Sequence, residues 1–190
     1  MPPRKLSPPG CIYQIKITLR DLRPPVWRRV QVRNDISLGD LHQIIQTVMG
    51  WTNSHLHMFL IQGVEYGEPA PQYDWEVKEE RKVKLNRVVP GEKFKFRYTY
   101  DMGDSWEHEI LIEKILPVVS EVPRYGICIT GKRACPPEDC GGSWGYTELI
   151  ETLRDPNHPE YESMLEWVGG DLDPEAFDLS EVNESLQQLG

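Results

Sequence analysis

The chain has 190 residues, of which 39% are hydrophobic and 27% charged, and its formal net charge is −9. This composition is typical of a folded globular protein and excludes a disordered chain. Apolar runs are far shorter than the ~20 residues of a membrane span, and the Pro-rich, basic residues 1–10 do not form a signal peptide. We therefore expect a cytoplasmic protein with no membrane contact, a flexible N-terminal tail at 1–10 and a single α+β domain over 11–190.

Charge is unevenly distributed along the chain. Residues 1–33 carry eight Lys or Arg against the single acid Asp21, whereas residues 134–190 carry fourteen Asp or Glu against the single base Arg154. An acidic protein is repelled by phosphates, which argues against nucleic acid as a partner. We expect the two charged ends to face each other, within one molecule or across a dimer.

The first half of the chain predicts strands around one helix. Residues 12–19 alternate between apolar and polar side chains, as in a half-buried strand, and a second strand follows a Pro-rich turn. Ser37 and Asp40 form a capping box that opens a helix ending at Gly50. Residues 55–62 are apolar on both faces, which predicts a fully buried central strand. Residues 67–81 form a long loop, and Val83 and Leu85 begin another short strand.

The second half predicts a β-hairpin followed by helices. Phe94, Phe96, Tyr98 and Tyr100 share one face of a strand, residues 102–105 form the turn, and a second strand begins at Trp106. Residues 117–144 are irregular. Helices follow over 146–153, from Pro159 to Gly169, and after a cap at Ser180. The order of elements predicts an α+β fold: a mostly antiparallel sheet with a β-grasp-like N-terminal part and a helical C-terminal part.

Three clusters of polar and aromatic residues could carry chemistry. The first is Trp51 to His57, where His55 and His57 at i, i+2 of a strand would share a face and could share a metal. The second spans Tyr100 to His108 around a tight turn. The third contains Cys135 and Cys140, whose spacing is within reach of a zinc knuckle. Because each cluster combines aromatics, glycine and polar groups, we expect all three to meet in one site.

Simpler structural roles compete with each of these interpretations. Histidines on apolar strands are more often buried and hydrogen-bonded, turn aspartates bond the local backbone, and lone cysteines pack as small apolar groups. A clear zinc motif would contain paired C-x2-C segments at regular spacing, whereas this sequence has one looser pair, Cys135 and Cys140. No phosphate-binding glycine motif and no nucleophile elbow occur in the sequence. We therefore expect no cofactor and no tightly bound metal.

The three clusters also carry a family resemblance. The segments Trp51–Phe59, Tyr98–His108 and Pro136–Tyr146 resemble the plasmid pRiA-type ORF-three-like family, and the likeness extends from about Tyr13 to about Asn183. Members are also labelled transposon passengers or putative resolvases. The resemblance implies an association with mobile elements, but it supplies no catalytic residues. A resolvase-type serine nucleophile among arginines is absent, because Ser7 lies in the Pro-rich tail.

We interpret the chain as a non-catalytic binding or interaction domain with an unknown ligand or protein partner. The alternative is a hydrolase or metal-dependent enzyme using His55, His57, Asp101, Asp104 and His108. A weaker alternative is a DNA-associated accessory protein. The candidate binding site comprises Trp51, His55, His57, Tyr100, Asp101, Asp104, Trp106, His108, Glu138, Trp144 and Tyr146.

Overall fold

The computed structural model describes residues 10–70, 72, 76–118 and 122–189, so the predicted tail lies almost entirely outside the described residues. The strands are β1 (Cys11–Leu19), β2 (Trp27–Arg33), β3 (His57–Ile61), β4 (Val64–Gly67), β5 (Lys78–Glu79), β6 (Lys95–Tyr100), β7 (Trp106–Pro117) and β8 (Ile127–Lys132). The helices are α1 (Leu38–Met49), the 3₁₀ turn η2 (Glu80–Lys82), α2 (Leu85–Val88), α3 (Gly142–Arg154), α4 (Tyr161–Trp167) and α5 (Leu179–Gln187).

These strands form one sheet in the order β5-β4-β3-β6-β7-β1-β2-β8. Every neighbouring pair is antiparallel except β4 and β5. The prediction of an α+β fold with a mostly antiparallel sheet is therefore confirmed. In the described part of the chain, no helix has both the length and the apolar character needed to cross a membrane.

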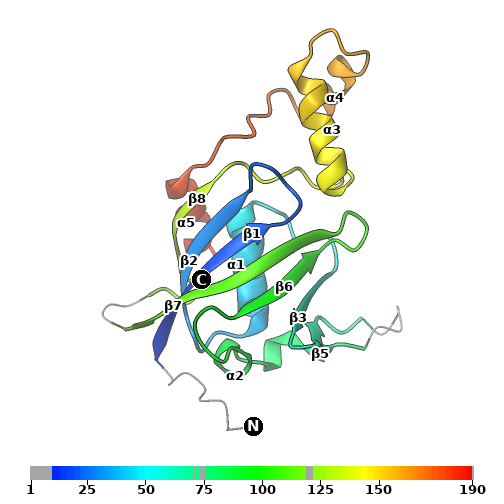
Figure 1. Cartoon of the computed structure of the whole chain (residues 1–190). Helices are drawn as coiled ribbons and strands as arrows, with labels where there is room; N and C mark the ends of the chain where they lie inside the picture. Colours follow the sequence, from blue (N-terminus) through cyan, green and yellow to red (C-terminus); the bar gives the residue numbers. More distant parts are fainter. Residues whose placement is uncertain (1–9, 71, 73–75, 119–121, 190) are drawn as a thin grey trace.

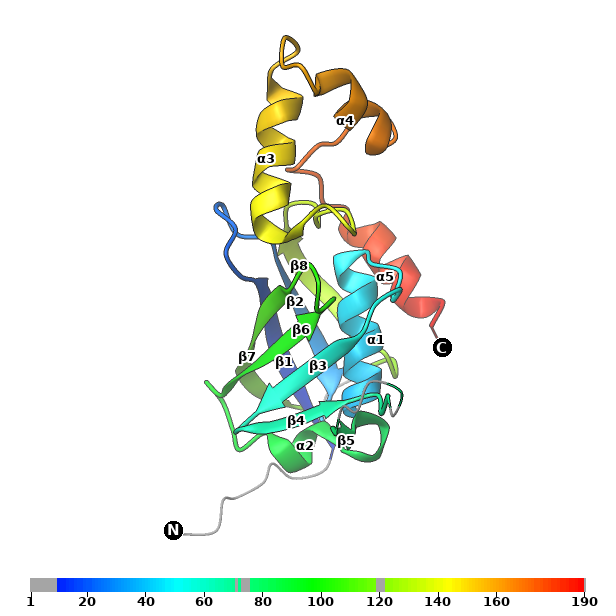
Figure 2. The ribbon, with the colours of Figure 1, turned by 90° about the vertical axis from the view of Figure 1, so that its right-hand side faces the viewer.

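Helix α1 covers one face of the sheet and α5 lies beside it (Figures 1 and 2). The predicted capping box is present: Ser37 Oγ accepts from Asp40 N at 3.0 Å, and the Asp40 carboxylate accepts from Ser37 N at 3.0 Å. Gly50 ends the helix in the left-handed region, with φ 94°. The core between helix and sheet includes the buried residues Tyr13, Ile15, Ile17, Leu19, Leu41, Ile45, Phe96, Tyr98 and Tyr100.

Helices α3 and α4 project beyond one end of the sheet, and we call residues 142–168 the arm (Figure 1). A Cβ on Gly142, which has φ +70°, would lie 2.4 Å from the Asp104 carbonyl oxygen. Only glycine fits there, so the start of the arm is held against the β6–β7 turn. At the other end, Gly169 and Gly170 have open space around them. Helix α4 contains no buried residue.

Several predicted elements differ from the structure. Strand β3 is buried on one face only, because Met58 and Leu60 stay partly exposed. The strand predicted at Val83 and Leu85 is wrong, since Val83 directly follows η2 and Leu85 is the first residue of α2. The backbone of this segment bonds the start of α1, where Leu38 N donates to Val83 O at 2.9 Å.

Towards the C-terminus, residues 117–144 are not wholly irregular, because they contain β8. Helix α4 begins at Tyr161, two residues after the predicted start. The cap of α5 is Asp178 instead of Ser180: its side chain accepts from the backbone N–H of Ser180 and Glu181.

In the described part of the chain, no ion pair joins the basic N-terminal third to the acidic C-terminal third, although the Arg28 guanidinium stacks on the Phe177 ring at 4.5 Å from its centroid. Arg20 pairs with Glu107 at 2.9 Å, and Arg29 pairs with Glu113 at 2.6 Å. Both acids lie on β7, next to β1 in the sheet. Across residues 134–189, ion pairs engage only two acids, Asp139 and Glu175. The acidic end of the molecule therefore keeps most of its charge uncompensated.

Candidate functional site

Three loops meet at the base of the arm. They are the segment between α1 and β3 (residues 51–56), the β6–β7 turn (residues 101–105) and the segment before α3 (residues 135–141). Trp51 Nε1 donates to Pro136 O at 3.1 Å, and Gly141 N donates to the Asp104 carboxylate at 3.2 Å. The expectation that the three sequence clusters meet is confirmed. We call this place the three-loop site.

Glu138 ties the loops together. Its carboxylate accepts from Thr52 Oγ1 at 2.5 Å and from Tyr100 Oη, while Tyr100 Oη accepts from Ser54 N at 2.9 Å. Burial acts to raise the pKa of the Glu138 carboxyl, but the bonds donated by Thr52 and Tyr100 outweigh burial and hold that pKa below its usual value. Burial and the same bond raise the pKa of Tyr100. Glu138 therefore accepts as a carboxylate while Tyr100 keeps its proton.

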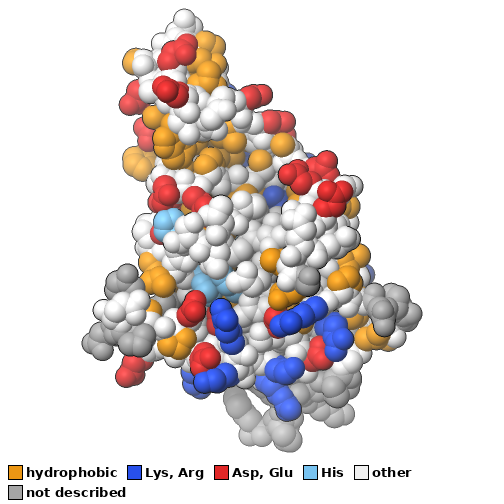
Figure 3. All heavy atoms as spheres, turned by 180° about the vertical axis from the view of Figure 1, so that it is seen from behind, with side chains coloured by type: hydrophobic (Ala, Val, Ile, Leu, Met, Phe, Trp, Pro, Cys, Tyr) orange, Lys and Arg blue, Asp and Glu red, His pale blue; other side chains and the backbone are white. Residues whose placement is uncertain are grey.

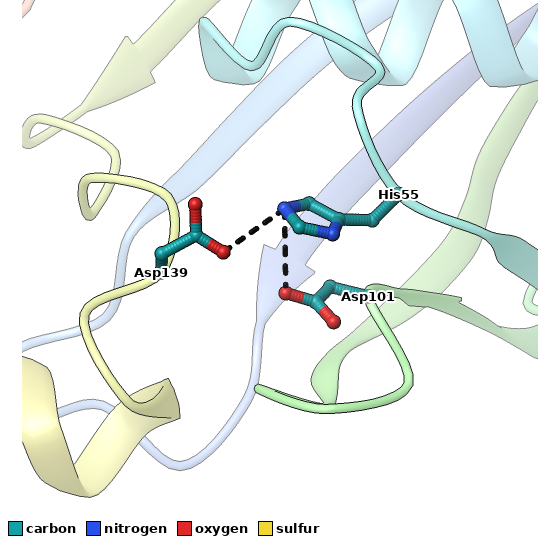
Figure 4. Close-up of side chains that lie close together, drawn as sticks. All are labelled: His55, Asp101 and Asp139. Atoms are coloured by element: carbon teal, nitrogen blue, oxygen red, sulfur yellow. Dashed lines mark ion pairs between the residues drawn. The ribbon is translucent and has the colours of Figure 1, made fainter.

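His55 lies between two aspartates from the other loops (Figure 4). Its Nε2 is 3.1 Å from Asp139 Oδ1 and 3.7 Å from Asp101 Oδ2. Asp101 and Asp139 both have left-handed backbone, with φ 58° and 60°, a conformation that costs free energy and that occurs often at functional sites. One imidazole nitrogen and two carboxylate oxygens facing one another could hold a metal ion.

The Trp51 ring packs against aromatic side chains that lie beneath the three-loop site. Its ring centroid lies 4.9 Å from that of Tyr100 and 5.9 Å from that of Trp106, and its ring meets His108 edge-on at 5.2 Å. Trp106 and His108 are buried beneath it. His108 Nδ1 lies 3.3 Å from Tyr98 O, which can only accept, so Nδ1 carries the proton. Burial lowers the pKa of His108 to about 4, and its imidazole is neutral at neutral pH.

His57 does not share a face with His55. It lies in β3 and is buried, with Nε2 at 2.8 Å from a Glu80 carboxylate oxygen and its ring stacked on His42 at 3.4 Å. Burial and the neighbouring His57 imidazole lower the pKa of His42 to about 3. The two histidines therefore do not form the shared site that their i, i+2 spacing could have allowed, because His55 precedes the strand, in a bend.

Sequence reasoning missed His42 and Glu80. His42 follows Leu38 by four residues, so the inward stripe of α1 could have indicated its burial. Glu80 lies in a segment interpreted as a loop, and no local pattern marks it.

The remaining candidates lie on α3 or before it. Trp144 is 83% exposed, whereas Tyr146 is buried. Burial raises the pKa of the Cys135 thiol above its usual value and that of Cys140 to about 12. Both thiols therefore stay protonated at neutral pH, and a protonated thiol is a poor nucleophile and metal ligand.

The five residues of the catalytic alternative do not form one constellation. His55, Asp101 and Asp104 belong to the three-loop site, whereas His57 is paired with Glu80 and His108 lies beneath Trp51. Acid–base chemistry requires its groups within hydrogen-bond reach of one substrate, and this set does not meet that requirement.

Comparison with known proteins places the chain among uncharacterised relatives. Over 182 residues it is 41% identical to the uncharacterized protein y4hQ of Sinorhizobium fredii (strain NBRC 101917 / NGR234), covering 95% of this chain and 93% of that protein. The crystal structure of a protein of unknown function, MM3350 from Methanosarcina mazei Go1, aligns with a TM-score of 0.79 and 39% identity, over 90% of this chain and 97% of the other. Residues 11–181 match the plasmid pRiA4b ORF-3-like proteins, and the chain belongs to that family.

Proposed function

We propose that this chain is a binding domain whose arm captures a basic, partly apolar peptide segment of another protein. The observation that carries the proposal is a groove between α3 and α4 that combines acidic and apolar side chains. The groove has a volume of about 370 Å³ and reaches from the three-loop site to the end of α4. Its acids are Asp139, Glu148 and Glu160, and its apolar residues include Leu149, Met164 and Trp167.

Apolar surface on the arm is exposed in the described part of the structure. Trp167 is 48% exposed and Trp144 83% exposed. Helix α4 carries apolar side chains and yet buries none of its residues completely. Exposed apolar patches with a polar rim are typical of protein interaction sites, and tryptophan is enriched among the residues that dominate binding energy.

Charge indicates the chemistry of the partner. The arm belongs to the segment whose acids are mostly without cationic partners, and on the face that Figure 3 shows, Lys and Arg side chains gather towards the end of the molecule opposite the arm. Complementary charge steers association and disfavours wrong partners. A segment with Lys or Arg beside an apolar side chain would match both features of the groove.

The other two hypotheses have less support. DNA carries the same sign of charge as the arm, and two arginines of the N-terminal third, Arg20 and Arg29, engage acids of β7. The five residues named in the enzyme hypothesis are not all gathered in one place. The association with mobile elements stays a prediction.

Fluorescence anisotropy with a labelled synthetic peptide of alternating arginine and leucine tests the proposal. We expect saturable binding that Trp167→Ala weakens about tenfold or more, since a tryptophan at a hot spot contributes over 1.4 kcal/mol. The separate variant Glu148→Lys should also weaken binding, because it replaces an acid of the groove with a positive charge that repels the basic peptide.

Glu151→Lys is the matched control, since Glu151 is exposed on the same helix and does not line the groove. Equal loss in Glu148→Lys and Glu151→Lys would show general charge attraction and contradict a groove. A peptide of arginine and glycine that binds equally well would contradict the apolar part of the proposal.

A further inference from the structure

We propose that His55, Asp101 and Asp139 form a site for an exchangeable divalent cation, with Mn²⁺ as the best-matched ion. The three donor atoms come from three different loops and face one another (Figure 4). They all lie within 4.8 Å of one another. Nitrogen and oxygen ligands at about 2.0–2.2 Å from a cation lie roughly 3–4 Å apart. The distances of 3.1 and 3.7 Å from His55 Nε2 already fall in that range.

The charge around these ligands favours a cation. Four carboxylates meet at the three-loop site, those of Asp101, Asp104, Glu138 and Asp139. Among the residues that the structure describes, neither Lys nor Arg forms an ion pair with any of them, and His55 is the only basic partner. A divalent ion would compensate negative charge that the protein itself leaves largely unbalanced.

One ligand is oriented by a bond of its own, and a second follows a residue that is fixed in place. Asp101 Oδ1 accepts from Gly103 N at 2.8 Å, so Oδ2 is the oxygen left facing His55. Asp139 follows Glu138, whose carboxylate is fixed by Thr52 and Tyr100. Supporting bonds of this kind orient metal ligands and strengthen binding.

The ligand set selects the kind of ion. Magnesium and calcium prefer oxygen alone, and zinc and copper prefer more nitrogen or sulfur. Two carboxylates and one imidazole, with positions open to water, suit Mn²⁺. Asp139 is well exposed, with 70% of its side chain accessible, so the ion would exchange with solvent. Such a site differs from the tightly bound zinc that the sequence argues against.

Electron paramagnetic resonance of free Mn²⁺ during titration of the chelator-treated full chain measures this binding. We expect one Mn²⁺ per chain. His55→Gln and Asp101→Asn should each weaken the affinity about tenfold or more, and Asp139→Asn should act likewise. Asp171→Asn is the charge-matched control, because Asp171 is exposed and outside the site, and it should leave the affinity unchanged. Thermal melts by circular dichroism verify that each variant is folded.

Three outcomes would overturn the proposal: no saturable binding to the folded parent chain, several ions bound per chain, or an affinity that His55→Gln and Asp139→Asn leave unchanged. Displacement of Mn²⁺ by equimolar Mg²⁺ would overturn the role of the imidazole. His55 does not line the groove of the arm. A loss of Mn²⁺ in His55→Gln with peptide binding intact therefore separates this site from the proposed peptide site.

Discussion

The hydroxyl of Tyr100 should stabilise the fold by linking two of the three loops. The change Tyr100→Phe removes one bond donated to the Glu138 carboxylate and leaves Ser54 N without the acceptor that lies 2.9 Å away. A hydrogen bond to a charged group contributes about 1.5–3 kcal/mol, and an unpaired N–H costs about 1 kcal/mol or more. We expect the free energy of unfolding to fall by about 2–4 kcal/mol.

Urea denaturation followed by tryptophan fluorescence measures this loss. Tyr161→Phe is the control, because Tyr161 is half-buried on α4, outside the three-loop site; its effect should stay within about 0.5 kcal/mol. In a double-mutant cycle with Glu138→Gln, Tyr100 and Glu138 should show a coupling of about 1 kcal/mol or more. A loss in Tyr100→Phe no larger than in Tyr161→Phe, with no coupling, would refute the role of Glu138 as the link between the loops.

Two further predictions concern the core. Phe96→Ala should lower the free energy of unfolding by about 3–5 kcal/mol in urea melts, because Phe96 is buried with its ring centroid 6.3 Å from that of Phe59; a change below about 1 kcal/mol would show that this ring packs poorly. Acidification should destabilise the protein. The pKa of His108 is lowered to about 4 in the folded protein, so as the pH falls the unfolded state takes up a proton on His108 before the folded state does. Stability should therefore fall as the pH drops from about 6.5 towards 4. His108→Gln should flatten that fall in urea midpoints measured at several pH values, and an unchanged slope would contradict a neutral, buried His108.

Local patterns predicted the parts of the fold whose side chains alternate strictly. Strand β1 from Tyr13 onward, strand β6 and strand β7 as far as Ile112 bury every second residue, and this period is visible in the sequence. Strand β8 escaped prediction because only Cys128 of its six residues is buried. Its pairing with β2 is also shifted near Val30, and such irregular pairing leaves no clean period.

The site could be predicted in part. The composition of the three clusters was enough to predict that they meet, because core packing does not require glycine, acids and aromatics together. The partners of each histidine were not predictable. Asp139 lies 84 residues after His55 and contacts it from a loop, where the backbone of Asp139 is left-handed. Glu80 contacts His57 from a segment with no regular pattern. Such contacts depend on how distant segments return to the sheet.

The glycines at the two ends of the arm have different surroundings, and this affects how the arm can vary. Gly142 is enclosed by the backbone of Asp104, so a substitution there would displace the three-loop site. Gly169 and Gly170 also have positive φ, of 81° and 118°, which favours glycine, but a Cβ added to either would meet no other atom within 4 Å. Insertions or replaced segments should therefore be tolerated after α4 and rejected before α3. Evolution or protein engineering should therefore be able to change α4, and with it the specificity of binding, while the sheet and the three loops at the base of the arm stay unchanged.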